Sequence, residues 1–209
     1  GPTLGDAIPG FGTDGIRGRV GSVVTPALCL QVGYWVGRVL AVEGPVLIGM
    51  DSRTSGSMVA SALTAGLTAA GREVWNLGLC PTPAVPLLIR KFGAAGGLMV
   101  SASHNPPTDN GIKVFGANGA KLAPERQARI EAGLRGEIDH SEHDHSLCGG
   151  LRQSSDLMAD YRELLHSDVG DHRLDGVPRV LELCWGCATA GAAAALADRG
   201  AHVRDSSGE

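Results

Sequence analysis

The chain has no long apolar run and no long run of basic residues, and each absence argues against a class of protein. The net charge is −4 at pH 7, so the attraction that drives non-specific nucleic-acid binding is missing. No apolar stretch approaches the roughly 20 residues that span a bilayer. The first residues also lack the basic and apolar regions of a secretory signal. We therefore expect no nucleic-acid partner and no membrane partner.

Cysteine is also scarce. The five cysteines are scattered through apolar segments, and an odd number without a framework suits a reducing, cytoplasmic compartment. Cys184 and Cys187 have the spacing of a redox or zinc pair, but a zinc site would need a second pair of ligands, and none is evident. We interpret the cysteines as buried structural residues, with a Cys-x-x-Cys oxidoreductase as an alternative.

Apolar segments of strand length alternate with segments of helix length. Strands are predicted at residues 46–50, 73–77, 98–102 and 111–115, and helices at 27–42, 57–70, from Thr82 and Pro83 onward, and at 124–134. Gly71 is expected to end the second helix, and Thr82 to cap the third. This alternation predicts an α/β fold, a three-layer α/β/α domain with a mixed sheet.

The pattern is interrupted at residues 136–152, a polar loop whose three histidines could bind a metal, although a solvated loop is favoured. Beyond it we predict a helix at 154–167, a strand at 180–184, a helix at 189–199 and a further strand from 201. Such a short set of elements cannot bury a core alone. We expect residues 1–153 to form one domain and residues 154–209 to begin a second, similar α/β domain of a longer protein.

The most informative segment follows the third predicted strand, which leads into Ser101, Ser103, His104 and Asn105. A strand that ends in hydroxyl, imidazole and amide groups presents them on a rigid sheet, where α/β proteins place their chemistry. A phosphate carrier needs an exposed hydroxyl, nearby hydrogen-bond donors and a cation. Lys113 can supply the cation if the next strand returns beside the loop. The alternative is a turn rich in Ser and Asn.

Residues 11–18 form a second polar segment, in which glycines surround Thr13, Asp14 and Arg17. Such a loop can bring backbone N–H groups close to an anion, and an arginine can hold phosphate through two parallel hydrogen bonds. The alternative is a glycine-rich turn with a surface Arg–Asp pair.

Residues 49–56 form a third polar segment, at a predicted junction between strand and helix. Arg53 could pair with Asp51 or Asp14, and helix N-termini attract anions. We expect Arg53 to support the active loop rather than contact the substrate.

Together these segments resemble one family, the α-D-phosphohexomutases, which include phosphoglucomutase, phosphomannomutase and phosphoglucosamine mutase. The resemblance covers residues 10–205 and rests on segments in the family's order and spacing: residues 11–18, 51–56, 81–83, 101–106 and 110–113. Within the family, residues 12–18 and Ser101 are most similar to the phosphoglucosamine mutase branch.

The resemblance implies a four-domain enzyme in which Ser103 carries a phosphoryl group and exchanges it with a hexose or hexosamine phosphate through a sugar bisphosphate. For the phosphoglucosamine mutase branch, the implied reaction interconverts glucosamine 6-phosphate and glucosamine 1-phosphate. Lys113 would be the general acid and base, and His104 and Asn105 would orient the phosphoserine. The remaining implied residues bind substrate phosphate (Arg17, Thr13, Asp14) or support the loop (Arg53, Ser101).

The resemblance also implies Mg²⁺, with the oxygen of Ser103 as one ligand. The family's Asp-x-Asp-x-Asp-Arg metal loop does not occur in this sequence, and residues 183–188 depart from the family's pattern. We therefore expect these residues alone to be inactive. The alternatives are a phosphomannomutase or phosphoglucomutase, and a non-catalytic truncated relative with a binding role. A monomer or homodimer is expected.

Overall fold

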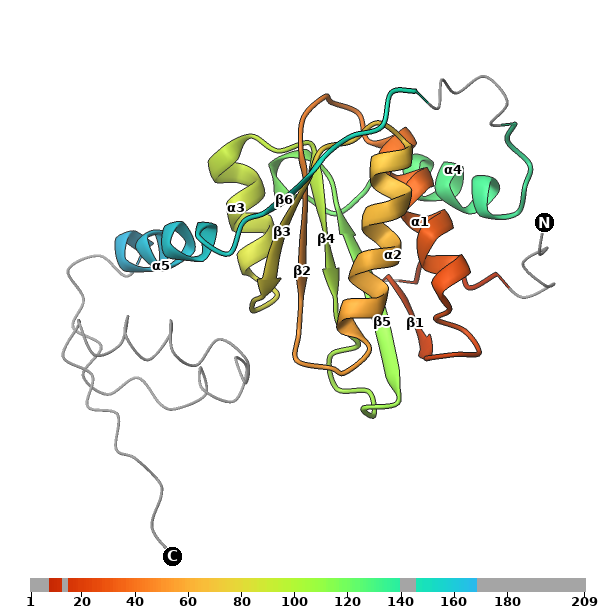
Figure 1. The fold of residues 1–209 in the computed structure, drawn as a ribbon, viewed down its shortest axis with the longest axis horizontal. Helices are drawn as coiled ribbons and strands as arrows, with labels where there is room; N and C mark the ends of the chain where they lie inside the picture. The colour runs from red at the N-terminus through yellow and green to blue at the C-terminus, as the bar shows by residue number, and fades with distance from the viewer. Residues whose placement is uncertain (1–7, 13–14, 140–145, 169–209) are drawn as a thin grey trace, which may run out of the picture.

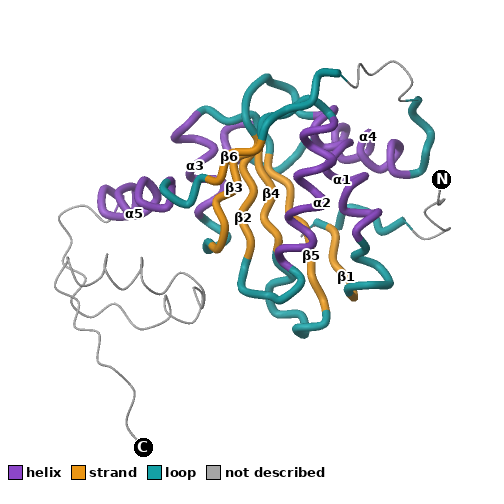
Figure 2. The backbone as a smooth tube through the Cα atoms, in the orientation of Figure 1, coloured by secondary structure: helices purple, strands orange, loops and turns teal. Residues whose placement is uncertain are grey.

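The computed structural model describes residues 8–12, 15–139 and 146–168. Several predictions lie outside these ranges: those for Thr13 and Asp14, for the three histidines of the polar loop, for the Cys184–Cys187 pair, and for the elements after residue 168. Figure 1 shows a central sheet with helices packed on it, and Figure 2 shows the same backbone coloured by secondary structure.

Six strands form one mixed sheet in the order β1-β5-β4-β2-β3-β6. β2, β3, β4 and β6 are parallel, whereas β5 runs antiparallel to both β1 and β4. The bounds of the strands are β1 Ile16–Arg19, β2 Val46–Met50, β3 Val74–Leu79, β4 Gly96–Val100, β5 Asp109–Phe115 and β6 Leu151–Gln153. The prediction of a mixed α/β sheet is confirmed.

The helices lie on both faces of this sheet (Figure 1). Their bounds are α1 Pro26–Val39, α2 Gly56–Ala69, α3 Ala84–Phe92, α4 Pro124–Leu134 and α5 Leu157–Asp168, with a short 3-10 turn η1 at Ala117–Gly119. On one face, α1 and α2 bury an apolar cluster with Ile48, Leu98 and Ile112. On the other, α3 packs against Leu47 and Met99. Alternate residues of each strand therefore enter different layers.

Close contact between α1 and α2 depends on glycine. A Cβ atom at Gly33 would collide with the backbone of Leu63, and one at Gly66 would collide with the carbonyl of Leu30. The two helices therefore pack backbone to backbone. This holds α2, the helix that follows the loop with Arg53, closely against α1.

Several predicted boundaries agree with the structure, among them the complete ranges of β2 and α4. Gly71 follows α2 with φ +87°, as expected of the left-handed residue that ends a helix. Thr82 was wrong as the cap of α3, since Pro83 occupies that position and makes no side-chain capping bond. β4 also begins and ends two residues earlier than predicted, because the backbone turns away after Ser101.

Residues 151–168 pack onto the same sheet. β6 pairs with β3 at its outer edge, and α5 places Leu157 and Tyr161 in the apolar cluster under α3. The first two residues of β6 lie inside the stretch 136–152 that the sequence predicted as a loop, so that prediction was wrong at its end. The domain boundary after residue 153 stays a prediction. None of the helices in the described ranges is long and apolar enough to cross a membrane.

Candidate active site

Ser103 lies at the tip of the polar loop that follows β4, and its side chain is exposed. Its φ angle is +53°, a left-handed conformation that is unfavourable for a residue with a Cβ atom. The backbone N–H of Ser103 donates to the hydroxyl of Ser101 at 3.0 Å, and Ser101 is itself buried. The strained backbone is therefore held from within the loop and directs the Ser103 hydroxyl outward.

Arg17 reaches the same hydroxyl from β1. Its Nη2 atom donates to Ser103 Oγ at 3.2 Å. β1 pairs with β5 so that Arg17 lies opposite Gly111. A Cβ at Gly111 would lie 2.7 Å from the carbonyl oxygens of both Ile16 and Ser101, so glycine allows these strands to approach closely. The pairing brings a guanidinium next to a serine that is 86 residues away in the sequence.

Arg53 binds the backbone of the same loop from the segment before α2. Its guanidinium donates to four carbonyl oxygens: Pro106 at 2.6 Å, Asp109 at 3.1 Å, Ser103 at 2.9 Å and Asn105 at 3.0 Å. The fifth donor, Nε, pairs with the carboxylate of Asp51 at 3.2 Å. All the donors of Arg53 are thereby used within the protein. Arg53 thus fixes the path of the loop and has no N–H left for a ligand.

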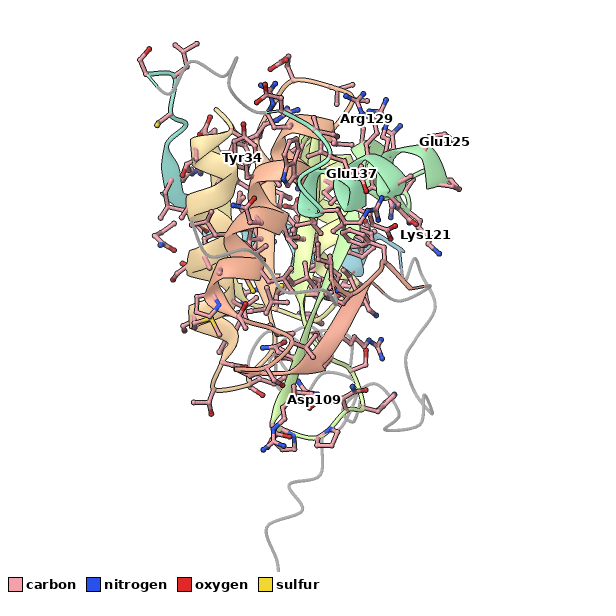
Figure 3. The ribbon with its side chains drawn as sticks, turned by 90° about the vertical axis from the view of Figure 1, so that its right-hand side faces the viewer. Tyr34, Asp109, Lys121, Glu125, Arg129 and Glu137 are labelled. Carbon is pink, nitrogen blue, oxygen red and sulfur yellow. The ribbon has the colours of Figure 1, made fainter. Side chains whose placement is uncertain are left out.

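Two asparagines complete the loop. Asn105 donates through its side chain to the carboxylate of Asp109 at 3.1 Å, which closes the loop across its base. Asn110 is buried, donates to Ser55 Oγ at 2.8 Å and accepts from the N–H of Gly111 at 2.8 Å. Asn110 and Ser55 were not singled out by the sequence reasoning. One signal was available for Asn110, because it directly precedes the predicted strand 111–115. A buried amide at that position must form hydrogen bonds, and these would point to a partner such as Ser55. Figure 3 shows Asp109 at the lower end of the sheet.

Lys113 and His104 occupy different surroundings from the residues above. Lys113 pairs with Met99 in the sheet and lines a pocket next to the start of α3. His104 is exposed beside Ser103. Within the described residues, no hydrogen bond or ion pair joins either side chain to Ser103. The structure therefore brings Arg17, Ser101, Asn105 and Arg53 to the serine loop, and the roles of Lys113 and His104 stay predictions.

The described residues supply few metal ligands. None of their His, Cys, Asp and Glu side chains form a group of three that could hold an ion. The exposed oxygen of Ser103 is available as a single hard ligand, whereas Mg²⁺ takes near-octahedral oxygen coordination. Within the described part of the chain, these residues fit one position of a magnesium site and not a complete one.

This arrangement suits a covalent phosphate carrier. An exposed hydroxyl lies on a braced loop beside an arginine, whose guanidinium can donate two parallel hydrogen bonds to a phosphate. The hydrogen bonds hold the loop without a ligand. Such a fixed position suits phosphoryl transfer, in which the attacking and leaving oxygens must lie in line. The fold and the serine loop thus define an α/β/α domain with an exposed serine hydroxyl next to an arginine.

Comparison with known proteins assigns the family. The family model described as phosphoglucomutase/phosphomannomutase, alpha/beta/alpha domain I, matches residues 9–140. The chain therefore belongs to the phosphoglucomutase/phosphomannomutase family, and the resemblance seen in the sequence is confirmed.

The relatives agree. The chain is 90% identical over 209 residues to a phosphoglucosamine mutase of Synechococcus sp. strain CC9902, covering 100% of this chain and 45% of that protein. It is 69% identical over 209 residues to a phosphoglucosamine mutase of Synechococcus sp. strain CC9605, again covering 100% of this chain and 45% of that protein. The chain thus spans somewhat less than half the length of these relatives.

Solved structures agree as well. A putative phosphomannomutase from Thermus thermophilus has a TM-score of 0.64 and 33% identity, covering 78% of this chain and 36% of that chain. A phosphoglucomutase/phosphomannomutase family protein from Burkholderia thailandensis has a TM-score of 0.62 and 25% identity, covering 76% of this chain and 35% of that chain.

Proposed function

We propose that the protein containing this chain is a phosphohexomutase that interconverts glucosamine 6-phosphate and glucosamine 1-phosphate. The observation that carries the proposal is Ser103, held at φ +53° with its hydroxyl exposed and an Arg17 donor 3.2 Å from that hydroxyl. The 90% identity to a phosphoglucosamine mutase of Synechococcus supports the choice of substrate.

In the proposed reaction, each bond that breaks is matched by a bond that forms, and Lys113 accepts and returns the proton. In the first half, the Oγ–P bond of phosphorylated Ser103 breaks while a bond forms between the phosphorus and a sugar hydroxyl oxygen. The proton of that hydroxyl passes to the side-chain nitrogen of Lys113, the proposed general base. In the second half, the bond between the other phosphorus and its sugar oxygen breaks while a bond to Ser103 Oγ forms. Lys113 then returns the proton to that sugar oxygen. Arg17 neutralises charge on the transferred group throughout.

The other predicted residues take supporting roles in this proposal. His104 and Asn105 orient the phosphoserine, Thr13 and Asp14 contribute to substrate phosphate binding, and Ser101 and Arg53 hold the loop.

Mg²⁺ is part of the proposal as the metal of the complete enzyme. When bound, it would supply positive charge to the transferred phosphoryl group. The described residues offer it only the Ser103 oxygen, so its carboxylate ligands would come from other residues. The steps above are assigned to side chains of this chain alone.

The cellular context follows from the same proposal. The partners would be a hexosamine phosphate and a sugar bisphosphate, and the enzyme would be cytoplasmic, as a monomer or homodimer.

The test uses the full-length product of the gene that encodes this chain. The protein is incubated with glucosamine 1,6-bisphosphate, and intact mass spectrometry should show one added phosphate in the wild type and none in Ser103→Ala. Ser61→Ala, a serine exposed on α2, is the matched control and should be phosphorylated like the wild type. Phosphate retained on Ser103→Ala would contradict Ser103 as the carrier.

Turnover decides between the candidate functions. Glucosamine 6-phosphate should be converted with a higher kcat/KM than mannose 6-phosphate or glucose 6-phosphate. Preference for mannose 6-phosphate would favour a phosphomannomutase, the function for which the similar Thermus protein is named. Absence of turnover with all three sugars would favour a non-catalytic relative.

A further inference from the structure

Two asparagines of this chain precede a glycine, Asn110 and Asn118. An Asn-Gly pair can modify itself, because the backbone nitrogen of the glycine can attack the side-chain amide carbon of the asparagine. Glycine favours this attack, since it has no side chain to hinder it. The two pairs have the same local chemistry, so the fold decides which of them reacts.

Asn118 lies in the short turn η1, between β5 and α4. The residue is exposed, and its backbone is left-handed with φ +62°. Within the described residues, its side chain forms no hydrogen bond. None of the residues of η1 is buried. Water therefore reaches both the side-chain amide of Asn118 and the backbone of the turn.

The packing of this turn requires the Asn-Gly pair. A Cβ atom at Gly119 would lie 2.5 Å from the carbonyl oxygen of Pro86 in α3, and the φ angle of Gly119 is +69°. Both conditions select glycine at position 119. Position 118 needs a residue that accepts the left-handed conformation, and asparagine does so more readily than most residues. A larger residue after Asn118 would hinder the attack, but the contact with α3 does not allow one.

The turn is closed mainly by weak hydrogen bonds. Gly119 N donates to the carbonyl of Gly116 at 3.2 Å, and Ala120 N donates to that of Ala117 at 3.5 Å, at and beyond the long end of the usual range. Only the bond from Gly116 N to the carbonyl of Ala120 is short, at 2.8 Å. The attack requires Gly119 N to leave its acceptor and turn toward the Asn118 side chain. Opening one exposed turn costs far less free energy than unfolding the domain.

Asn110 is protected by the same fold. It is fully buried in β5, and its Nδ2 atom, the leaving group of the reaction, donates to Ser55 Oγ at 2.8 Å. Gly111 N lies 2.8 Å from Asn110 Oδ1, but it donates its hydrogen to that oxygen. A base in solvent cannot remove this hydrogen until the strand opens. The carbonyl of Gly111 is also held, because it accepts from Ser101 N at 3.0 Å.

We propose that Asn118 is a site of spontaneous deamidation in the folded protein. A base in solvent removes the proton of Gly119 N, and this nitrogen forms a bond to Asn118 Cγ. The bond from Cγ to Nδ2 breaks, and Nδ2 leaves as ammonia after taking a proton from water, which restores the base. One water molecule then opens the cyclic imide at either carbonyl and leaves aspartate or isoaspartate. One water is taken up, one ammonia is released, and no electrons are transferred.

The product alters a turn that packs against α3. Aspartate adds a negative charge three residues before Lys121. Isoaspartate adds the same charge and also lengthens the backbone by one methylene group, next to the close contact between Gly119 and Pro86. The inference does not depend on the proposed function.

The test compares the two pairs in the full-length product of the gene. The folded protein is incubated at mildly alkaline pH, and samples taken over time are digested with trypsin and analysed by mass spectrometry. Trypsin cleaves after lysine, so Asn110 lies in peptide 92–113 and Asn118 in peptide 114–121. Asn105 does not interfere, because the proline after it has no N–H. Deamidation in 114–121 should be at least about tenfold faster than in 92–113.

The same protein unfolded in urea is the control. Unfolding exposes both pairs, so peptides 92–113 and 114–121 should then react at comparable rates. Asn118→Gln should remove the change from 114–121 in the folded protein, because attack on glutamine requires a larger ring. If 114–121 of the folded protein stays unmodified over the time in which the unfolded protein reacts, the inference is overturned. Equal or faster deamidation in 92–113 of the folded protein also overturns it, because the fold would then not select Asn118.

Discussion

Arg53 Nη2 lies 2.9 Å from the carbonyl oxygen of Ser103, the residue with the left-handed backbone. The contact joins the loop before α2 to the serine loop and is one of four such bonds from a single guanidinium. A planar group with five donors can bind several carbonyls in one plane, whereas an ammonium cannot. The position of the serine therefore depends on an arginine that does not contact its hydroxyl.

The first prediction concerns that arginine. Arg53→Lys should lower kcat of the full-length enzyme by about 10- to 100-fold with a smaller change in KM, because the serine loses its orientation. Loss of the charge-assisted bonds should also cost about 1–3 kcal/mol of stability. Arg135→Lys, at an exposed arginine paired with Glu137, is the matched control and should leave kcat unchanged. A wild-type kcat in Arg53→Lys would refute a positioning role.

The second prediction separates strain from chemistry at Ser103. Glycine adopts φ +53° without penalty, whereas alanine does not. Ser103→Gly should therefore be more stable than Ser103→Ala by about 1 kcal/mol, while both variants lose phosphorylation. Thermal melting checks the first expectation and intact mass the second. A lower melting temperature for the glycine variant would show that the left-handed conformation is not maintained in solution.

A third prediction concerns Arg72, whose buried guanidinium binds backbone carbonyls at and just after the C-terminal end of α1. Its guanidinium donates to the carbonyls of Gly37 at 2.8 Å, Val42 at 2.6 Å and Leu40 at 3.0 Å, and only 8% of the residue is exposed. Arg72→Met keeps most of the apolar stem but leaves these carbonyls unpaired. We expect a loss of about 3–5 kcal/mol in the free energy of unfolding. Denaturant titration measures it, and a loss below about 1 kcal/mol would contradict the role.

The fourth prediction is a loss of stability at alkaline pH. Burial raises the pKa of Cys80 to about 12 and that of Cys29 to about 11, from an ordinary value of 9.0. Above pH 9 the unfolded chain releases these protons and the folded chain keeps them. Stability is therefore full below pH 9 and falls as pH rises, by about 1 kcal/mol per thiol per pH unit.

The matched experiment compares the wild type with a Cys29→Ala/Cys80→Ala double variant in urea titrations between pH 8 and 10. The double variant should show the smaller decline, and equal slopes would rule out the thiols as the cause. Peptide-level mapping with iodoacetamide under native conditions should label the exposed Cys148 and leave Cys29 and Cys80 unmodified.

The sequence predicted those elements whose signal is local. β2 is a continuous apolar run, and α4 begins at a proline and ends with its apolar spacing, so both ranges were correct. β1 was missed because it lies in a glycine-rich segment typical of a loop, and because Ile16 pairs with Ile112, far away in sequence. β6 was missed because its three residues are exposed at the sheet edge and show no alternation.

For the site, the sequence indicated which polar residues to consider and did not indicate their arrangement. Ser103 stood out because a hydroxyl, an imidazole and an amide follow a buried strand. That Arg17 reaches its hydroxyl depends on the antiparallel pairing of β1 with β5, which no local pattern reveals. The surroundings of Lys113 depend likewise on strand alternation, which places it in the pocket next to the start of α3.

The bracing of the serine loop also bears on which partner would move in the proposed reaction. Arg53, Ser101 and the pair formed by Asn105 and Asp109 tie the loop to itself and to the segment before α2. A serine fixed in this way cannot swing between two distant acceptor positions. In the proposed reaction, the bisphosphorylated sugar must therefore rotate end over end within the enzyme while the loop stays still. In that reaction the serine loop would stay in place while the sugar turns.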